Sequence, residues 1–320
     1  MLATIAILTY NGQDYLRRIL ESLRVQTDVV GEVEVLVIDS GSTDSTLAII
    51  DDFPEVRLHC IPNSDFQHGR TRNLAAQLAQ GEFVVYLTHD AVPIGEHWLA
   101  SMLAPFSISD DVVAVVGKQV PRAHCFPLLK YEIRGVFAGL GADHGVTLYR
   151  RPLGDLDESL VAGLGFYSDV NSAARRSTLV GSLPYEEVPY AEDQLFGQAV
   201  IRAGLIKAYS PGAAVEHSND LTLSEYGKRI FDETVGLRRI EFAIPVMTRR
   251  AQARLTVRGI LGDSLRILRD SGFARRRKVY WLLVNPVFHV RKWSSYRPAT
   301  TVNLSDSQAI SAGSLEASRR

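Results

Sequence analysis

Cysteine is scarce in this chain: Cys60 and Cys125 are the two cysteines among 320 residues. Two cysteines exclude a disulfide-built scaffold and any site made of several cysteines, and such low usage is typical of a reducing compartment. The sequence also lacks an apolar run of ~18 residues, the length that a membrane-spanning helix needs. No basic segment precedes the first apolar run, so we interpret Thr4–Thr9 as a strand and expect no secretory signal peptide.

The composition is that of a folded protein, with 46% hydrophobic and 22% charged residues, which excludes a disordered or fibrous chain. The net charge of −1 conceals an asymmetry. Residues 1–248 contain 20 Lys and Arg against 32 Asp and Glu, whereas residues 249–320 contain 15 against 4. An acidic body followed by a basic segment indicates two regions with different partners. We expect no nucleic-acid partner, because the basic segment lacks a recognisable nucleic-acid-binding motif.

The first half of the sequence alternates short apolar runs with segments of helical periodicity. The runs are Thr4–Thr9, Val33–Ile38, Phe83–Thr88 and Val112–Val116. Leucine, isoleucine and alanine recur between them at helical spacing. This alternation predicts an α/β fold with a largely parallel sheet covered by helices. Ligands bind such sheets at the carboxyl ends of the strands, so the polar residues after each run are the candidates for a site.

Polar turns follow the first two predicted strands, with the sequences Thr9-Tyr10-Asn11 and Asp39-Ser40-Gly41-Ser42-Thr43-Asp44. Free backbone N–H groups in such turns can bind an anion, and the Asp39 carboxylate can accept hydrogen bonds from a base or ribose. The alternative is an ordinary loop in which Asp44 caps the next helix. Asp90 follows the third strand. Its carboxylate can either hold a divalent metal on a diphosphate or cap a turn.

These motifs resemble those of the family 2 glycosyltransferases of the GT-A fold, in their order and over roughly residues 1–230. The resemblance also includes Gly69-x-x-Arg72-Asn73 and the later Glu192-Asp193 pair. Five further segments are similar to the rhamnosyltransferase branch of the family: Phe66–Asn73, Thr88–Pro93, Gly117–Arg122, Ser168–Ser172 and His217-Ser218. The resemblance implies inverting transfer of L-rhamnose from dTDP-L-rhamnose to a hydroxyl of a glycan or lipid-linked acceptor, in bacterial surface polysaccharide synthesis.

Two alternatives stay open within this resemblance. One is a family 2 transferase with a UDP-sugar donor, against which the Phe66–Asn73 segment argues. The other is a non-catalytic GT-A-like module that docks a complex at the membrane. Such a module is expected to have lost Asp90 or Asp193, and both are present.

The metal motif departs from the family pattern. Most members carry Asp-x-Asp, whereas Asp90 here has Thr88 two places before it and Val92 two places after it. The resemblance implies Mg²⁺ or Mn²⁺ held weakly by Asp90, with His217 as the second protein ligand. A purely structural histidine is the alternative for His217.

Asp193 is the candidate general base, because glycosyl transfer needs a group that takes the proton of the attacking hydroxyl. Glu192-Asp193 lies at a predicted helix start, where the helix dipole would keep Asp193 ionised. The alternative is that these two acids only stabilise the positive end of the helix dipole and have no catalytic role. The resemblance adds His68, Arg72 and Asn73 on the donor side. The alternative is that Arg72 is an ordinary surface arginine and that Asn73 caps a helix. The resemblance places Lys118, Gln119, Asp169, Asn171 and Glu192 around the sugar or acceptor pocket.

We expect residues 1–230 to form the GT-A domain, 231–296 a basic helical extension and 297–320 a disordered tail. Between Arg249 and Trp293 there are 12 basic and 2 acidic residues. Basic residues beside leucine, tyrosine and tryptophan predict amphipathic helices in the interface of an anionic membrane. A cytoplasmic protein at the inner face of the cell membrane would meet lipid-linked acceptors there. The alternative is that these helices pack on the body or form a homodimer interface.

Overall fold

The computed structural model describes residues 1–152, 154 and 157–319. The chain divides into two compact units. Unit 1 consists of Met1–Val120 and Gly135–His217, and unit 2 consists of Pro121–Arg134 and the residues from Ser218 onward. The second unit therefore begins earlier than the predicted boundary at residue 231, and it includes a segment from the middle of the chain.

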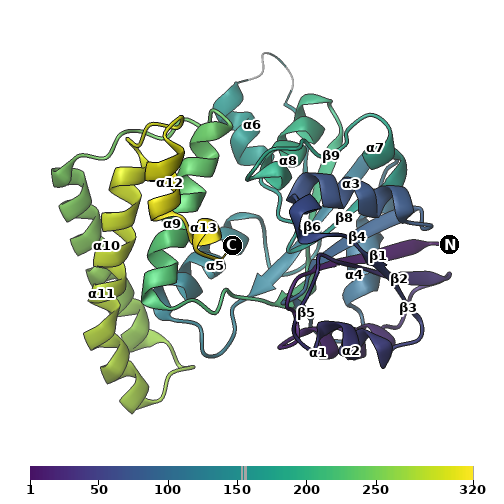
Figure 1. The fold of residues 1–320 in the computed structure, drawn as a ribbon, viewed down its shortest axis with the longest axis horizontal. Coiled ribbons are helices and arrows are strands. Elements are labelled where there is room, and N and C mark those ends of the chain that lie inside the picture. The colour runs from purple at the N-terminus through teal and green to yellow at the C-terminus, as the bar shows by residue number, and fades with distance from the viewer. Residues whose placement is uncertain (153, 155–156, 320) are drawn as a thin grey trace. The chain divides into compact units, whose positions relative to one another are not determined.

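The described part of unit 1 is built on one nine-stranded sheet with the strand order β3-β2-β1-β4-β8-β6-β9-β5, and β7 pairs with β9 (Figure 1). The strands are β1 (Ala3–Thr9), β2 (Val33–Asp39), β3 (Val56–Cys60), β4 (Phe83–Thr88), β5 (Val92–Pro93), β6 (Val112–Val120), β7 (Thr147–Tyr149), β8 (Asn171–Arg175) and β9 (Ile206–Glu216). Strands β1 to β4 pair in parallel, as do β6 and β9. Strand β8 runs antiparallel between β4 and β6. Strands β5 and β7 also pair antiparallel with β9. The predicted α/β class is confirmed, and these antiparallel strands are an addition to it.

Helices connect these strands (Figure 1). They are α1 (Leu16–Arg24), α2 (Thr46–Asp51), α3 (His68–Leu78), α4 (Trp98–Leu103), α5 (Pro127–Gly139), α6 (Glu158–Leu164), α7 (Arg176–Val180) and α8 (Glu192–Arg202), with 3₁₀ turns at Asn63–Asp65 and Ala104–Ser107. Helix α1 shows why the periodicity was informative: Leu16, Ile19 and Leu20 are buried against the sheet, and arginines occupy its exposed side. Helix α3 begins at His68, so Arg72 and Asn73 lie within it and do not open it.

A β-bulge interrupts the pairing of β6 with β9. Gly117 pairs with Ser210, whereas the next residue, Lys118, pairs with Ala214. The Asn171 side chain fills this irregularity, because its amide nitrogen donates to the carbonyls of Lys118 and Ala213, at 3.3 and 2.7 Å. Asn171 is fully buried. A buried backbone carbonyl without a partner is costly, so this asparagine stabilises the bulge instead of lining the predicted pocket.

Unit 2 is helical and has its own core. Its helices are α9 (Leu223–Arg239), α10 (Arg249–Arg269), α11 (Arg275–Ala299), α12 (Ser307–Gly313) and α13 (Leu315–Arg319). Phe126 and Leu128 of the 121–134 segment pack in one cluster with residues of α9, α10 and α11, among them Ile267, Trp281 and Phe288. Apolar side chains that the sequence places far apart therefore share this core, which is why the segment belongs to unit 2.

The C-terminal tail differs from its predicted disorder. Leu304 and Ile310 pack against Phe231 and Val235 of α9, and the backbone N–H of Leu315 donates to the Asp232 carboxylate at 2.8 Å. A few apolar residues in a segment rich in Ser, Thr and Ala were enough to anchor it.

Among the described residues, no helix combines the length and the hydrophobicity that a membrane span requires.

Candidate active site

The loops after β1 and β2 are held together by hydrogen bonds. The backbone N–H of Asn11 donates to the Ser42 hydroxyl at 2.8 Å, and the Asn11 side-chain oxygen accepts from the backbone N–H of Thr43 at 2.8 Å. Asn11 has a left-handed backbone with φ 50°, which asparagine tolerates better than most residues. The Tyr10 side chain is exposed. The two predicted donor loops therefore form one polar surface at the carboxyl edge of the sheet.

Asp39 shapes the second of these loops. Its carboxylate accepts hydrogen bonds from the backbone N–H groups of Gly41 and Ser42, at 3.0 and 2.9 Å, and from the Ser42 hydroxyl. Ser40 is tied to the Thr9 carbonyl through its backbone N–H and its hydroxyl. Only 1% of Asp39 is exposed, so in this structure its carboxylate faces its own loop.

Asp90 and His217, which are 127 positions apart in the sequence, lie together. The Asp90 Oδ2 is 3.3 Å from the His217 Nε2, and the His217 Nδ1 is 2.9 Å from the Gln119 Oε1. Burial acts to raise the pKa of Asp90, but the neighbouring His217 and His89 hold it well below its usual range. Asp90 is therefore an anion at neutral pH, next to an imidazole whose orientation Gln119 fixes.

This pair fits a divalent cation shared with a diphosphate. Mg²⁺ and Mn²⁺ accept carboxylate oxygen, and a histidine ligand commonly binds through one ring nitrogen while a hydrogen bond orients the other. Within the described residues no group of three or more His, Cys, Asp or Glu could hold a metal ion. If these two donors hold a cation, phosphate oxygens and water would have to fill its other coordination positions.

Gln119 connects this pair to the second half of the site. Its amide nitrogen donates to the Ser168 hydroxyl at 3.1 Å, and Ser168 precedes Asp169 in the loop before β8. Gln119 and Lys118 lie inside β6, not after it, because the strand extends to Val120. Lys118 points elsewhere and forms an ion pair with Asp143 at 2.5 Å.

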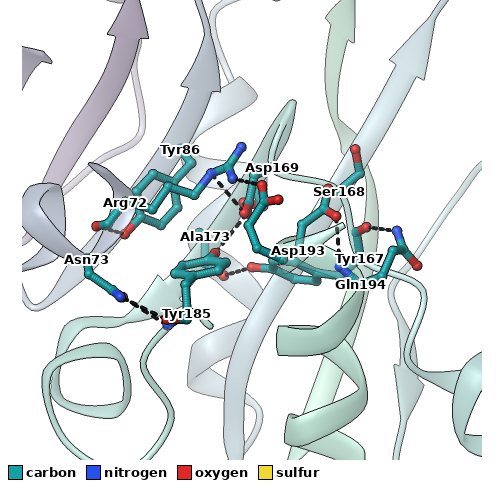
Figure 2. Close-up of polar contacts among 12 residues, drawn as sticks. Arg72, Asn73, Tyr86, Tyr167, Ser168, Asp169, Ala173, Tyr185, Asp193 and Gln194 are labelled. Atoms are coloured by element: carbon teal, nitrogen blue, oxygen red, sulfur yellow. Dashed lines mark hydrogen bonds and ion pairs between the residues drawn. The ribbon is translucent and has the colours of Figure 1, made fainter. Parts of the chain in front are cut away.

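Arg72 is enclosed by acidic side chains. Its Nε is 3.0 Å from the Asp169 Oδ2, and its Nη1 pairs with the Glu192 Oε1. Figure 2 shows Arg72 and Asp169 directed at each other, with Tyr185 and Asp193 beside them. Tyr185 donates its hydroxyl to the Asp169 carboxylate at 2.9 Å. Arg72 is only 6% exposed, so it organises these carboxylates and does not present its charge to a ligand as a surface arginine would.

The two carboxylates that Arg72 contacts differ in their proton affinity. Burial raises the pKa of Asp169, against the opposing effect of Arg72. Burial also acts to raise the pKa of Glu192, but Arg72 and His68 outweigh it and hold that pKa below its usual range. Glu192 is thus the firmly ionised partner of Arg72.

Asp193 occupies the first turn of α8, as predicted. Its carboxylate accepts a hydrogen bond from the backbone N–H of Gln194 at 2.8 Å, the one such bond that it receives within the described residues. Burial, followed by the charges of Glu192 and Asp169, raises the pKa of Asp193 to about 7. The helix N-terminus was expected to keep Asp193 fully ionised; burial and two neighbouring carboxylates outweigh it. A pKa near neutrality suits a group that takes and releases a proton.

Asn73 and several residues that the sequence did not single out support this arrangement. Asn73 exchanges two hydrogen bonds with the backbone of Tyr185, at 2.8 and 2.9 Å, so it positions Tyr185 and does not cap α3, whose N-cap is Gln67. Tyr86 donates its hydroxyl to the Arg72 carbonyl at 2.9 Å. Gln194 donates to the Tyr167 carbonyl (Figure 2). Tyr185 lies in an irregular segment, where no periodicity signals burial.

Comparison with known proteins gives a consistent result. The model of the family described as glycosyl transferase family 2 matches residues 4–179. The O-antigen chain rhamnosyltransferase RfbN of Salmonella typhimurium is 30% identical over 238 residues, which are 73% of this chain and 72% of that protein. The O-antigen chain rhamnosyltransferase WbaN of Salmonella anatum is 32% identical over 205 residues, 63% of this chain and 62% of the relative.

Solved structures are similar in fold. A mannosyltransferase from Pyrobaculum calidifontis in complex with GDP-Man and Mn²⁺ matches with a TM-score of 0.58 and 16% identity, over 93% of this chain and 84% of that one. Residues 1–349 of TarS from S. aureus match with a TM-score of 0.52 and 18% identity, over 94% and 90% of the two chains. At these identities the likeness concerns the fold alone.

Proposed function

The chain belongs to glycosyl transferase family 2, and we propose that it is an inverting rhamnosyltransferase that uses dTDP-L-rhamnose in the synthesis of a bacterial surface polysaccharide. The observation that carries this proposal is the arrangement around Gln119, which contacts both His217 of the Asp90–His217 pair and Ser168. Ser168 is the chain neighbour of Asp169, one of the carboxylates that raise the pKa of Asp193. The two O-antigen rhamnosyltransferase relatives support the choice of sugar.

Asp193 is the proposed general base. With a pKa of about 7 it is about half ionised at neutral pH, and its carboxylate takes the proton of the acceptor hydroxyl. The acceptor oxygen then forms a bond to the anomeric carbon while the bond from that carbon to the diphosphate breaks. One displacement on the opposite face inverts the β-linked donor to an α-linked product.

Asp90 and His217 are the proposed ligands of Mg²⁺ or Mn²⁺. The cation would act as a Lewis acid on the leaving diphosphate. Asp90 supplies a permanent negative charge for it, and Gln119 keeps the His217 Nε2 directed at the same place. We propose that the loops at Thr9–Gly12 and Asp39–Asp44 bind the nucleoside and that His68 lies near the donor sugar.

Removal of the metal should abolish transfer if this assignment is right. We expect excess EDTA to stop the reaction and Mg²⁺ or Mn²⁺ to restore it. Loss of a residue that only hydrogen-bonds to a metal ligand lowers metal affinity ~10–100-fold. Asp90 is the proposed ligand itself, so in Asp90→Asn the cation concentration for half-maximal activity should rise by at least that factor. Asp52→Asn is the matched control, since Asp52 is exposed and pairs with Arg17. Full activity of the wild type in EDTA would leave Asp90 without a metal role.

The donor is tested by a panel of nucleotide sugars with a lipid-linked acceptor. We expect transfer from dTDP-L-rhamnose and an α-linked product by NMR, with much less transfer from UDP-glucose, UDP-N-acetylglucosamine or GDP-mannose. Transfer from a UDP-sugar but not from dTDP-L-rhamnose would contradict the rhamnosyl assignment. Binding of a donor without turnover on any acceptor would instead favour a non-catalytic module.

The proposed acceptor is a glycan or a lipid-linked sugar, and the proposed place of reaction is the cytoplasmic face of the membrane. The presence of both Asp90 and Asp193 supports an enzyme over a docking module. A homodimer through the basic helices stays the competing explanation for their exposed surface.

A further inference from the structure

Helices α10 and α11 of unit 2 each carry a stripe of exposed apolar side chains. Every one of these side chains is at least 48% exposed, and Leu283 reaches 73%. They are Val257, Leu261, Leu265 and Leu268 on α10, and Val279, Tyr280, Leu283, Val287 and Val290 on α11. On both helices four of them follow the spacing i, i+4, i+8, i+11, which keeps them on one face over ~16 Å.

The core of unit 2 does not account for these stripes. The opposite sides of the two helices already supply the core, through Ile267, Trp281 and Phe288. The helices pack against each other (Figure 1), and the pair is fastened by the buried contact of the Asp263 Oδ2 with the His289 Nε2 at 2.9 Å. The stripes therefore lie outside a complete core, on a surface that the fold of unit 2 leaves uncovered. An apolar surface of this extent marks an interaction site.

The same surface is strongly basic. Helices α10 and α11 contain 13 Lys and Arg and a single acid, Asp263. Eight exposed arginines of these helices form no ion pair with any residue that the structure describes: Arg249, Arg250, Arg254, Arg258, Arg269, Arg275, Arg276 and Arg277. Arg254 and Arg258 project beside the α10 stripe, and the Arg275–Arg277 cluster stands at the N-terminal end of the α11 stripe. The surface thus joins apolar side chains with cations that need a negatively charged partner.

We propose that the exposed face of α10 and α11 binds an anionic lipid membrane, with both helices lying in its interface. The apolar stripes enter the boundary between headgroups and acyl chains, and the arginines contact lipid phosphates. Long arginine side chains can lie along apolar surface while their charged ends stay in the headgroup layer. This inference goes beyond the transfer reaction and does not depend on which sugar is transferred.

Other occupants fit the surface less well. A second copy of the chain would bring two surfaces of the same strong positive charge together, which is repulsive. A nucleic acid would satisfy the arginines but would leave nine apolar side chains in water. An anionic membrane satisfies both kinds of side chain at once.

Flotation of the full-length protein with vesicles tests this. We expect binding to vesicles that contain phosphatidylglycerol, weaker binding as salt increases, and little binding to pure phosphatidylcholine. The triple variant Arg275→Gln, Arg276→Gln, Arg277→Gln should bind on the order of 100-fold more weakly, since each basic residue near an anionic surface contributes ~1 kcal/mol. Leu261→Ser with Leu283→Ser should also release the protein. Val30→Ser and Arg17→Gln, at exposed positions of unit 1, are the matched controls and should leave binding unchanged.

Two further measurements keep the outcome clear. Circular dichroism melting shows that the variants remain folded, as expected for exposed positions. Light scattering gives the oligomeric state. The proposal would be overturned in favour of self-association if the wild type is a dimer that does not bind vesicles and if Leu261→Ser with Leu283→Ser makes it a monomer. Failure to float at low salt overturns it as well. Transfer to a water-soluble acceptor is measured separately, so failure of the membrane proposal is distinguishable from failure of the proposed reaction.

Discussion

Replacement of Asp193 by asparagine is expected to lower kcat by ~10²–10⁴ while the donor binds as in the wild type. The amide has nearly the shape of the carboxylate but cannot accept the proton of the acceptor hydroxyl. Donor affinity is measured by calorimetry and turnover by release of the nucleoside diphosphate. Turnover near the wild-type rate would exclude Asp193 as the base, and a large loss of donor affinity would assign it to binding.

The pH dependence provides an independent check. The base must be deprotonated, so kcat/KM of the wild type should rise with pH through about 7. The folded-state pKa lies above the ordinary value, so the proton binds more tightly to the folded protein. The contribution of Asp193 to stability therefore falls as pH rises from about 4 to about 7. Asp193→Asn should accordingly melt no lower than the wild type at pH 8, which separates lost chemistry from lost folding.

The second large effect is expected for Arg72→Met. Methionine fills a similar volume but leaves Asp169 and Glu192 buried without their cation. Loss of one partner of a buried ion pair costs about 3–5 kcal/mol, which urea unfolding should detect as a lower midpoint. Arg72 also lowers the pKa of the neighbouring Asp193, so in any folded fraction the inflection of kcat/KM should move above pH 7.

Arg70→Met is the matched control for this prediction. Arg70 lies two residues earlier on α3 and pairs with Glu187, but both side chains are more than half exposed. An exposed pair of this kind contributes about 0–1 kcal/mol. Equal stability of the two variants would show that Arg72 is no more than a surface arginine. Arg72→Lys should rescue little, because a single ammonium group cannot reproduce two directed contacts of a guanidinium.

Periodicity and motif order anticipated the positions of the main elements. The four apolar runs became β1, β2, β4 and β6, and the Glu192-Asp193 pair does begin a helix. Strand β3 was missed although Val56–Cys60 alternates apolar and polar residues, because it is only five residues long and is a half-exposed edge strand. The proximity of Asp90 to His217 followed from the family resemblance, and no local pattern could have placed two residues so far apart next to each other.

The roles of the polar residues around the site were harder to anticipate. Arg72 follows a glycine near the start of a helix, a position typical of an exposed side chain, and its partners lie 97 and 120 positions later in the chain. Asn171 belongs to a motif that suggested ligand contact, yet its amide satisfies carbonyls freed by a bulge. Tertiary contacts that a sequence does not display decide between these interpretations.

The discontinuity of unit 2 has a consequence for protein synthesis. Phe126 and Leu128 leave the ribosome long before Ile267, Trp281 and Phe288, the residues that cover them in the finished molecule. Domains fold as units, so these apolar side chains remain exposed until the C-terminal helices have been made. These side chains therefore stay uncovered while the residues between Leu128 and Ile267 are being made, and exposed apolar surface of this kind makes a nascent chain prone to aggregation. We expect a chain truncated before α10 to leave Phe126 and Leu128 without the side chains of α10 and α11 that cover them.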